Sequence, residues 1–194
     1  MASRDLQAVR DYAQRLHDAP PRAYHNWAHV EACLAELAGV RHLCRDAETV
    51  EWAFWFHDCI YDPTQRDNEE RSAAVAVAIL AKADIERARW NTVRQLILDT
   101  MHSAEPLAID GPVMVDIDLS ILGKEDSTFD AYDRAIREEY AHVPDADFAR
   151  GRATILRQFL ARPHIYRTAE FRTRYEPTAR KNLARAIAHY ANGA

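Results

Sequence analysis

Apolar residues recur at helical spacing along almost the whole chain, and the alternation that is typical of strands is hard to find. This periodicity predicts helices at about residues 4–18, 26–38, 47–58, 68–82, 85–102, 116–122, 127–143, 145–161 and 177–190. Residues 103–113 contain Pro106, Gly111 and Pro112, and they predict a loop. Pro177 suits the first turn of the last helix. The pattern therefore predicts an all-α fold of about seven to nine helices.

The helix expected over residues 47–58 is the most hydrophobic of the set. Its apolar residues leave no polar face; they are Val50, Trp52, Ala53, Phe54, Trp55 and Phe56. A helix that is apolar nearly all round belongs in the middle of a fold. We therefore expect its end, at His57 and Asp58, to lie near the core.

Composition narrows the class of protein. The chain of 194 residues fits one domain over residues 1–194, and 48% hydrophobic residues can form a sizeable core. The net charge of -5 disfavours binding to a nucleic acid polymer. The three cysteines form no CxxC pair, and the charged N-terminal stretch does not resemble a signal peptide. No apolar run reaches membrane length, so we expect a cytoplasmic protein without membrane association.

The candidate chemistry begins with His57 and Asp58. An unpaired carboxylate costs several kcal/mol to bury, so Asp58 needs a partner, and a divalent cation would provide one. The alternative is that Asp58 caps a neighbouring element and that His57 is a core histidine with a hydrogen-bond partner.

Two other polar sites in apolar surroundings strengthen the metal hypothesis. His29 lies on the flank of the helix expected at 26–38, beside Cys33, and Asp116 and Asp118 alternate with Val, Ile and Leu. Two imidazoles and two carboxylates form a mixed nitrogen and oxygen set. Such a set suits Mn, Fe, Co, Ni, Zn or Mg.

The order His29, then His57 and Asp58, then Asp118 resembles the H…HD…D signature of the HD-domain metal-dependent phosphohydrolases. The chain is most similar to a bacterial subgroup of predicted metal-dependent HD-superfamily phosphohydrolases. The shared motifs occur in order from Tyr24 to Leu183: YHNWAH, FHDCIYDP, DNEERSA, ILDTMHS, DIDLSILG, IREEY and ARKNL. The resemblance thus covers most of the chain and implies an HD-type helical domain.

The resemblance implies four ligands to one divalent metal ion: His29, His57, Asp58 and Asp118. The sequence around Asp118 matches the family's final Asp better than the sequence around Asp116, which is left as a helix cap or an outer partner. Dinuclear members of the family have extra histidines between the HD pair and the final Asp. Only His102 is available there, which favours one metal ion.

Three further residues are candidates for catalysis: Asp62, Glu69 and His102. Asp62 is retained where related alarmone hydrolases have HDxxED, although Tyr61 replaces the Glu. Each residue also has a simpler explanation. Asp62 can form a turn before Pro63, Glu69 can interact with a helix dipole, and His102 can end a helix on the surface.

The candidates for substrate binding are His25, Arg66 and Lys124. His25 comes four residues before His29, so it is either a wall of the pocket or a donor to a metal ligand. The two cations could neutralise a phosphate. Three aromatic residues in the last third could contact a second subunit in a homo-oligomer or simply cover the core: Tyr166, Phe171 and Tyr175.

Taken together, the residues and the resemblance lead us to expect a phosphohydrolase that cleaves a phosphomonoester or phosphodiester with metal-activated water. The substrate would be a nucleotide or a related small metabolite. One alternative is a non-catalytic regulatory module that binds a metal and a nucleotide. A second alternative is an HD-type diiron oxygenase, which needs two irons and additional histidine ligands.

Overall fold

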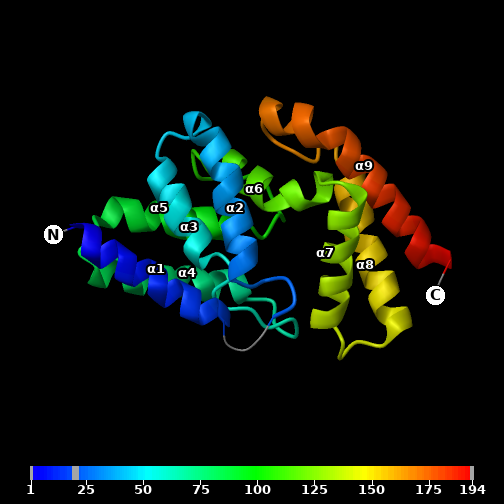
Figure 1. Ribbon diagram of the computed structural model, residues 1–194, viewed down its shortest axis with the longest axis horizontal. Helices are drawn as coiled ribbons and strands as arrows, with labels where there is room; N and C mark the ends of the chain where they lie inside the picture. The colour runs from blue at the N-terminus through cyan, green and yellow to red at the C-terminus, as the bar shows by residue number, and fades with distance from the viewer. Residues whose placement is uncertain (1, 19–21, 193–194) are drawn as a thin grey trace. The chain divides into compact units, whose positions relative to one another are not determined.

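The computed structural model describes residues 2–18 and 22–192, and within them it contains nine α-helices, two short 3-10 helices and no strand (Figure 1). This confirms the predicted all-α fold of seven to nine helices. The elements are α1 (Ala2–Asp18), α2 (Trp27–Val40), η1 (Arg41–Leu43), α3 (Ala47–Phe56), α4 (Asn68–Lys82), α5 (Arg87–Asp99), α6 (Gly111–Asp118), η2 (Leu119–Gly123), α7 (Asp126–Glu139), α8 (Asp145–Leu160) and α9 (Ala169–Asn192). They group into two units, which divide between Ile117 and Asp118.

The first unit is built around α3, which packs against α1, α2, α4 and α5. Its side chains from Thr49 to Phe56 are all buried except that of Glu51, as expected for a helix that is apolar nearly all round. The most deeply buried of them are Val50, Trp52, Ala53, Phe54 and Phe56. The structure therefore confirms that the most hydrophobic helix lies in the core of its unit.

The ends of α3 differ slightly from the prediction. Asp46 caps the helix, because its Oδ1 accepts a hydrogen bond from the Thr49 amide at 3.2 Å. The helix ends at Phe56, two residues earlier than expected. The Cys59 amide donates to the Phe56 carbonyl at 3.0 Å and closes a turn that holds the HD pair. The pair therefore follows α3 rather than forming its last turn.

The segment before Asp118 was predicted incorrectly, because α6 begins inside the region expected to be a loop. Pro112 stands in the first turn of α6, where its missing amide hydrogen costs nothing. The preceding loop is ordered by Asp99, which accepts hydrogen bonds from the amides of Leu107 and Ala108, both at 3.0 Å. A Cβ at Gly111 would lie 2.5 Å from Asp99 Oδ2, so this position requires glycine.

The start of α6 is tied to the start of α3 by one buried carboxylate. Asp110 accepts hydrogen bonds from the Arg45 amide at 2.8 Å and the Asp46 amide at 2.9 Å. Because Asp46 also caps α3, the two helices begin from one connected set of hydrogen bonds. This arrangement places α6 relative to the helix that leads to the HD pair.

In the second unit, α9 packs against α8 and η2, and α7 also contacts η2. The prediction that the last helix begins near Pro177 was wrong, because α9 begins at Ala169 and contains Pro177 in its interior. Phe171 and Tyr175 are both buried one turn apart. The packing of this apolar stripe outweighs the backbone hydrogen bond that the proline cannot make.

The three aromatic side chains for which the sequence left two alternatives open form part of the core of the second unit. Tyr166 and Phe171 are 0% exposed and Tyr175 is 5% exposed. They cover the core and offer no surface to a second subunit.

Among the helices that the structure describes, none has both the length and the apolar content that a membrane span requires.

Candidate metal centre

The site begins with His57, which follows α3 and is 1% exposed on its side chain. Its Nδ1 lies 3.1 Å from the Phe54 carbonyl oxygen. Because that oxygen only accepts, Nδ1 carries a hydrogen, and the ring in its neutral form presents an unprotonated Nε2. A histidine fixed through Nδ1 in this way is oriented to bind a metal through Nε2.

Three possible ligand atoms lie close together, and His57 Nε2 is one of them. His57 Nε2 lies 2.9 Å from Asp58 Oδ2 and 3.0 Å from His29 Nε2, and the distance between His29 Nε2 and Asp58 Oδ2 is 3.6 Å. Ligands about 2.1 Å from one metal ion lie roughly 3.0 to 3.4 Å from each other. The spacing of these atoms therefore matches the coordination sphere of a metal ion.

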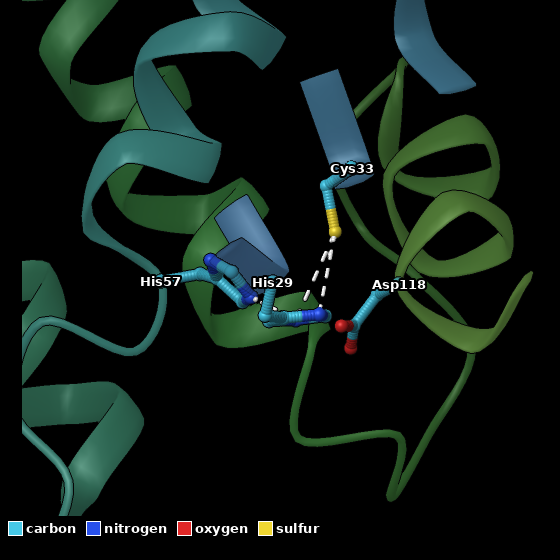
Figure 2. A group of neighbouring side chains, drawn as sticks. All are labelled: His29, Cys33, His57 and Asp118. Atoms are coloured by element: carbon cyan, nitrogen blue, oxygen red, sulfur yellow. Dashed lines mark hydrogen bonds between the residues drawn. The ribbon is translucent and has the colours of Figure 1, made fainter. Parts of the chain in front are cut away.

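Figure 2 shows two further side chains, Cys33 and Asp118, beside the histidines. One donor atom from each of His29, Cys33, His57 and Asp118 lies within 4.8 Å of the other three. Asp118 is the last residue of α6, whose other residues belong to the first unit. This group could hold a metal ion. It contains three of the predicted ligands, His29, His57 and Asp118, with Cys33 as its fourth member, whereas Asp58 is not part of it.

Cys33 is a member of the group that sequence reasoning missed. Its Sγ lies 3.8 Å from both ring nitrogens of His29, and the residue is buried. The signal was present in the sequence, because residues four apart on α2 share a face. A thiolate would add a soft ligand to the imidazoles and carboxylates.

The charge of Asp58 suits a metal ligand. Burial raises the pKa of this carboxyl, but the charge and hydrogen bond that His57 supplies when it is protonated, together with the charges of protonated His25 and His29, hold it well below its usual range. The side chain is only 16% exposed. Asp58 therefore remains ionised in a place where a carboxylate needs a positive partner.

Arg22 positions the HD turn, and the sequence did not indicate this role. Its guanidinium donates hydrogen bonds to the carbonyls of Asp58, of Cys59 at 3.1 Å and of His25 at 3.0 Å. These bonds tie the HD turn to the segment that leads into α2. Arg22 thus fixes the two parts of the chain that carry the histidine and carboxylate donors.

The His25 side chain lies near the HD turn. Its ring stacks on Tyr61, with ring centroids 4.0 Å apart and an interplanar angle of 20°. Its charge is among those that lower the pKa of Asp58, so the two side chains interact. His25 therefore lies near the HD turn, and its roles as a pocket wall and in substrate binding stay predictions.

Glu69 interacts electrostatically with Asp58 and with His102. Burial raises the pKa of Glu69, the negative charge of Asp58 raises it further, and His102 lowers it. α5 ends at Asp99, three residues earlier than predicted, and His102 has a φ of 53°. That left-handed backbone is uncommon for a residue other than glycine and turns the chain after α5.

The remaining predicted residues are not part of the donor group. Asp62 Oδ1 accepts hydrogen bonds from the Thr64 amide at 2.9 Å and hydroxyl at 2.7 Å, which is the turn-forming alternative. Arg66 is exposed. Lys124 belongs to the second unit, where it donates to the Tyr175 hydroxyl at 3.0 Å.

Asp116, the alternative to Asp118, is 0% exposed and lies outside the group. The geometry thus favours Asp118, as predicted.

Comparison of the chain with protein-family models, with curated proteins and with solved structures found no match in any of the three. The resemblance to the HD superfamily accordingly rests on the sequence motifs, and the donor geometry is an independent argument for a metal site.

Proposed function

We propose that the chain is a metal-dependent phosphohydrolase of the HD superfamily, acting on a phosphomonoester or phosphodiester of a nucleotide or related small metabolite. The observation that carries this proposal is the convergence of His29 Nε2, His57 Nε2 and Asp58 Oδ2 within 3.6 Å of one another. Buried acceptor atoms so close together need a shared proton or cation. The motif order supports the choice of a divalent cation.

The donor set supports one metal ion. One group of this kind is found within the described residues, whereas a diiron oxygenase needs two irons. Imidazole and thiolate ligands favour Zn, Co, Ni or Fe, and the carboxylates also suit Mn. Mg is the least favoured of the predicted metals because it prefers an all-oxygen environment.

When bound, the cation would lower the pKa of a water molecule and neutralise charge on the phosphoryl group. The residues of the chain supply the rest. The Phe54 carbonyl holds His57 in the tautomer that presents Nε2, and Asp58 supplies negative charge. Glu69, whose raised pKa suits proton transfer, accepts a proton from the attacking water or returns one to the leaving group.

The test measures metal content and turnover together. Protein stripped with a chelator is reloaded separately with Mn, Co, Ni, Zn and Mg, and then assayed against p-nitrophenyl phosphate, bis-p-nitrophenyl phosphate and a nucleotide panel. Asp58→Asn is expected to weaken metal binding by at least about 100-fold, more than the loss typical of an outer partner, and to abolish turnover. Glu69→Gln should retain the metal and lose turnover.

Asp67→Asn is the matched control, because this exposed carboxylate lies in the loop that leads into α4. It should behave as the wild type in both measurements. Metal binding without turnover of any ester would favour the regulatory module instead. Full metal content in Asp58→Asn would contradict the metal site itself.

A further inference from the structure

A cavity of about 530 Å³ lies between α1 and α3, lined by residues other than the metal donors. The lining residues that matter here are Arg10, Arg41, Glu48, Glu51, Trp52 and Trp55. Three of them, Glu48, Trp52 and Trp55, recur at spacings of four and three on one face of α3. Cavities that hold small molecules usually measure about 300 to 1,000 Å³, so the size fits a metabolite.

The two carboxylates that line the cavity are already paired with arginines. Glu51 Oε2 lies 3.1 Å from Arg41, and Glu48 Oε2 lies 2.8 Å from Arg89, so both carboxylates have guanidinium partners. Arg10 has no carboxylate partner among the residues that the structure describes. Its guanidinium lies 5.8 Å from the centre of the Trp27 ring. Arg10 is therefore the cation with which an anionic ligand would pair.

The floor of the cavity is aromatic. Trp52 is 1% exposed and Trp55 is 5% exposed, and the Arg89 guanidinium covers the Trp52 ring at 4.0 Å from its centre. The Trp55 Nε1 is buried and, within the described part of the chain, has no hydrogen-bond acceptor. Buried indole N–H groups usually have one. The cavity is thus lined by the two indoles on α3 and by Arg10 on α1.

We propose that this cavity binds a small anion carried on a flat apolar ring, such as an aromatic carboxylate or an aryl or nucleoside phosphate. The ring packs against the indoles of Trp52 and Trp55, and the anionic group pairs with Arg10. The cavity shares no residue with the metal centre, so the proposal is independent of the phosphohydrolase activity.

The test uses two dyes of similar shape in fluorescence titrations of the full-length protein. 8-Anilinonaphthalene-1-sulfonate carries a negative charge, and N-phenyl-1-naphthylamine is neutral. We expect saturable binding of the anionic dye, with an affinity that falls roughly tenfold in Arg10→Gln, because one charge-assisted hydrogen bond is lost. The neutral dye should bind Arg10→Gln and wild type equally.

Arg15→Gln is the matched control, since it removes the same charge from an exposed position of α1. Phenyl phosphate and benzoate should displace the anionic dye and benzyl alcohol should not; the better competitor indicates which anion the cavity prefers. Asp58→Asn should leave dye binding unchanged. Equal losses in Arg10→Gln and Arg15→Gln, or dye binding that disappears in Asp58→Asn, would overturn the proposal.

Discussion

The two units each bury an aspartate among polar side chains, but the neighbours of the two carboxylates differ. In the second unit, Asp133 accepts a hydrogen bond from Arg152 Nε at 2.9 Å and another from the Tyr190 hydroxyl at 2.5 Å. In the first unit, the nearest partners of Asp58 are the Nε2 atoms of His57 and His29. Both partners donate to Asp133, whereas a neutral imidazole nitrogen that lacks hydrogen is an acceptor.

This difference separates a structural site from a candidate functional site. The Asp133 cluster joins α7, α8 and α9, and each carboxylate oxygen has a donor from a different helix. Both carboxylate oxygens are therefore satisfied by donors of the chain itself. The Asp58 cluster gathers acceptor atoms that are stable together only with an added proton or cation. Burial alone therefore does not identify a functional carboxylate, but the hydrogen-bond character of its partners does.

The largest expected effect tests the structural cluster. Asp133→Asn leaves Arg152 buried without its counter-charge and should lower the free energy of unfolding by about 3 to 5 kcal/mol. Asp130→Asn on the same helix is the control, because its partner Arg185 is more than a third exposed and such pairs contribute about 1 kcal/mol or less. Urea denaturation of both variants measures the difference, and equal losses would show that the Asp133 cluster is not structural.

A second prediction concerns a buried histidine that must remain neutral. His17 is 0% exposed, and its Nδ1 bonds to the Ala13 carbonyl at 2.9 Å. Burial lowers its pKa to about 4. Below pH 6.5 this histidine binds a proton in the unfolded chain but not in the folded chain. The free energy of unfolding therefore has its full His17 contribution above pH 6.5, and it falls by about 3 kcal/mol as the pH decreases towards 4.

Replacing His17 with a residue that cannot be protonated should weaken the dependence of the unfolding free energy on pH. In metal-free protein, the loss of unfolding free energy between pH 7.5 and pH 4.5 should be about 2 to 3 kcal/mol smaller in His17→Phe than in the wild type. His42→Gln, at an exposed position of η1, should leave the profile unchanged. An unaltered profile in His17→Phe would mean that His17 takes up its proton equally in both states.

A third prediction compares the clusters by their response to metal. A cation at about 100 times its dissociation constant should stabilise the wild type by about 2.7 kcal/mol. Asp58→Asn should lose this increment and Asp133→Asn should keep it, because only the first changes a ligand. Thermal melts with Zn and with a chelator measure both. Equal stabilisation of the two variants by the metal would contradict the distinction between the Asp58 and Asp133 clusters.

The smallest effect concerns the choice of metal. Cys33→Ser removes the soft donor near His29 and should weaken binding of Zn roughly tenfold while leaving the affinity for Mn nearly unchanged. Cys44→Ser, outside the group, is the control. Competition titrations measure both metals. An equal loss for Zn and Mn would indicate that the thiol acts through packing instead.

The helices that form single amphipathic or apolar stripes were predictable from the sequence, as the bounds of α4 show. The wrong helix bounds occur at two prolines whose effect was judged from neighbouring residues alone. Pro112 was assigned to a loop and Pro177 to the start of a helix, but the buried stripe through Phe171 and Tyr175 makes α9 begin before Pro177. Local rules cannot weigh packing against a lost hydrogen bond.

The site was predictable to the extent that residue type and burial indicate it. His29, His57 and Asp118 were expected and lie together. Arg22 was missed, because a guanidinium that binds backbone carbonyls leaves no pattern in the sequence. Asp62 was a candidate for catalysis or for a turn at Pro63; its bonds to Thr64 form the turn, and a role in catalysis stays a prediction.

The account depends on a divalent cation at the convergence of His29, His57 and Asp58. Anomalous X-ray diffraction from crystals grown with Co or Mn tests this directly, with data collected above and below the absorption edge of the metal. We predict one strong peak about 2.0 to 2.3 Å from both Nε2 atoms and from Asp58 Oδ2. The absence of a peak there, while the same metal occupies another site, would contradict the account.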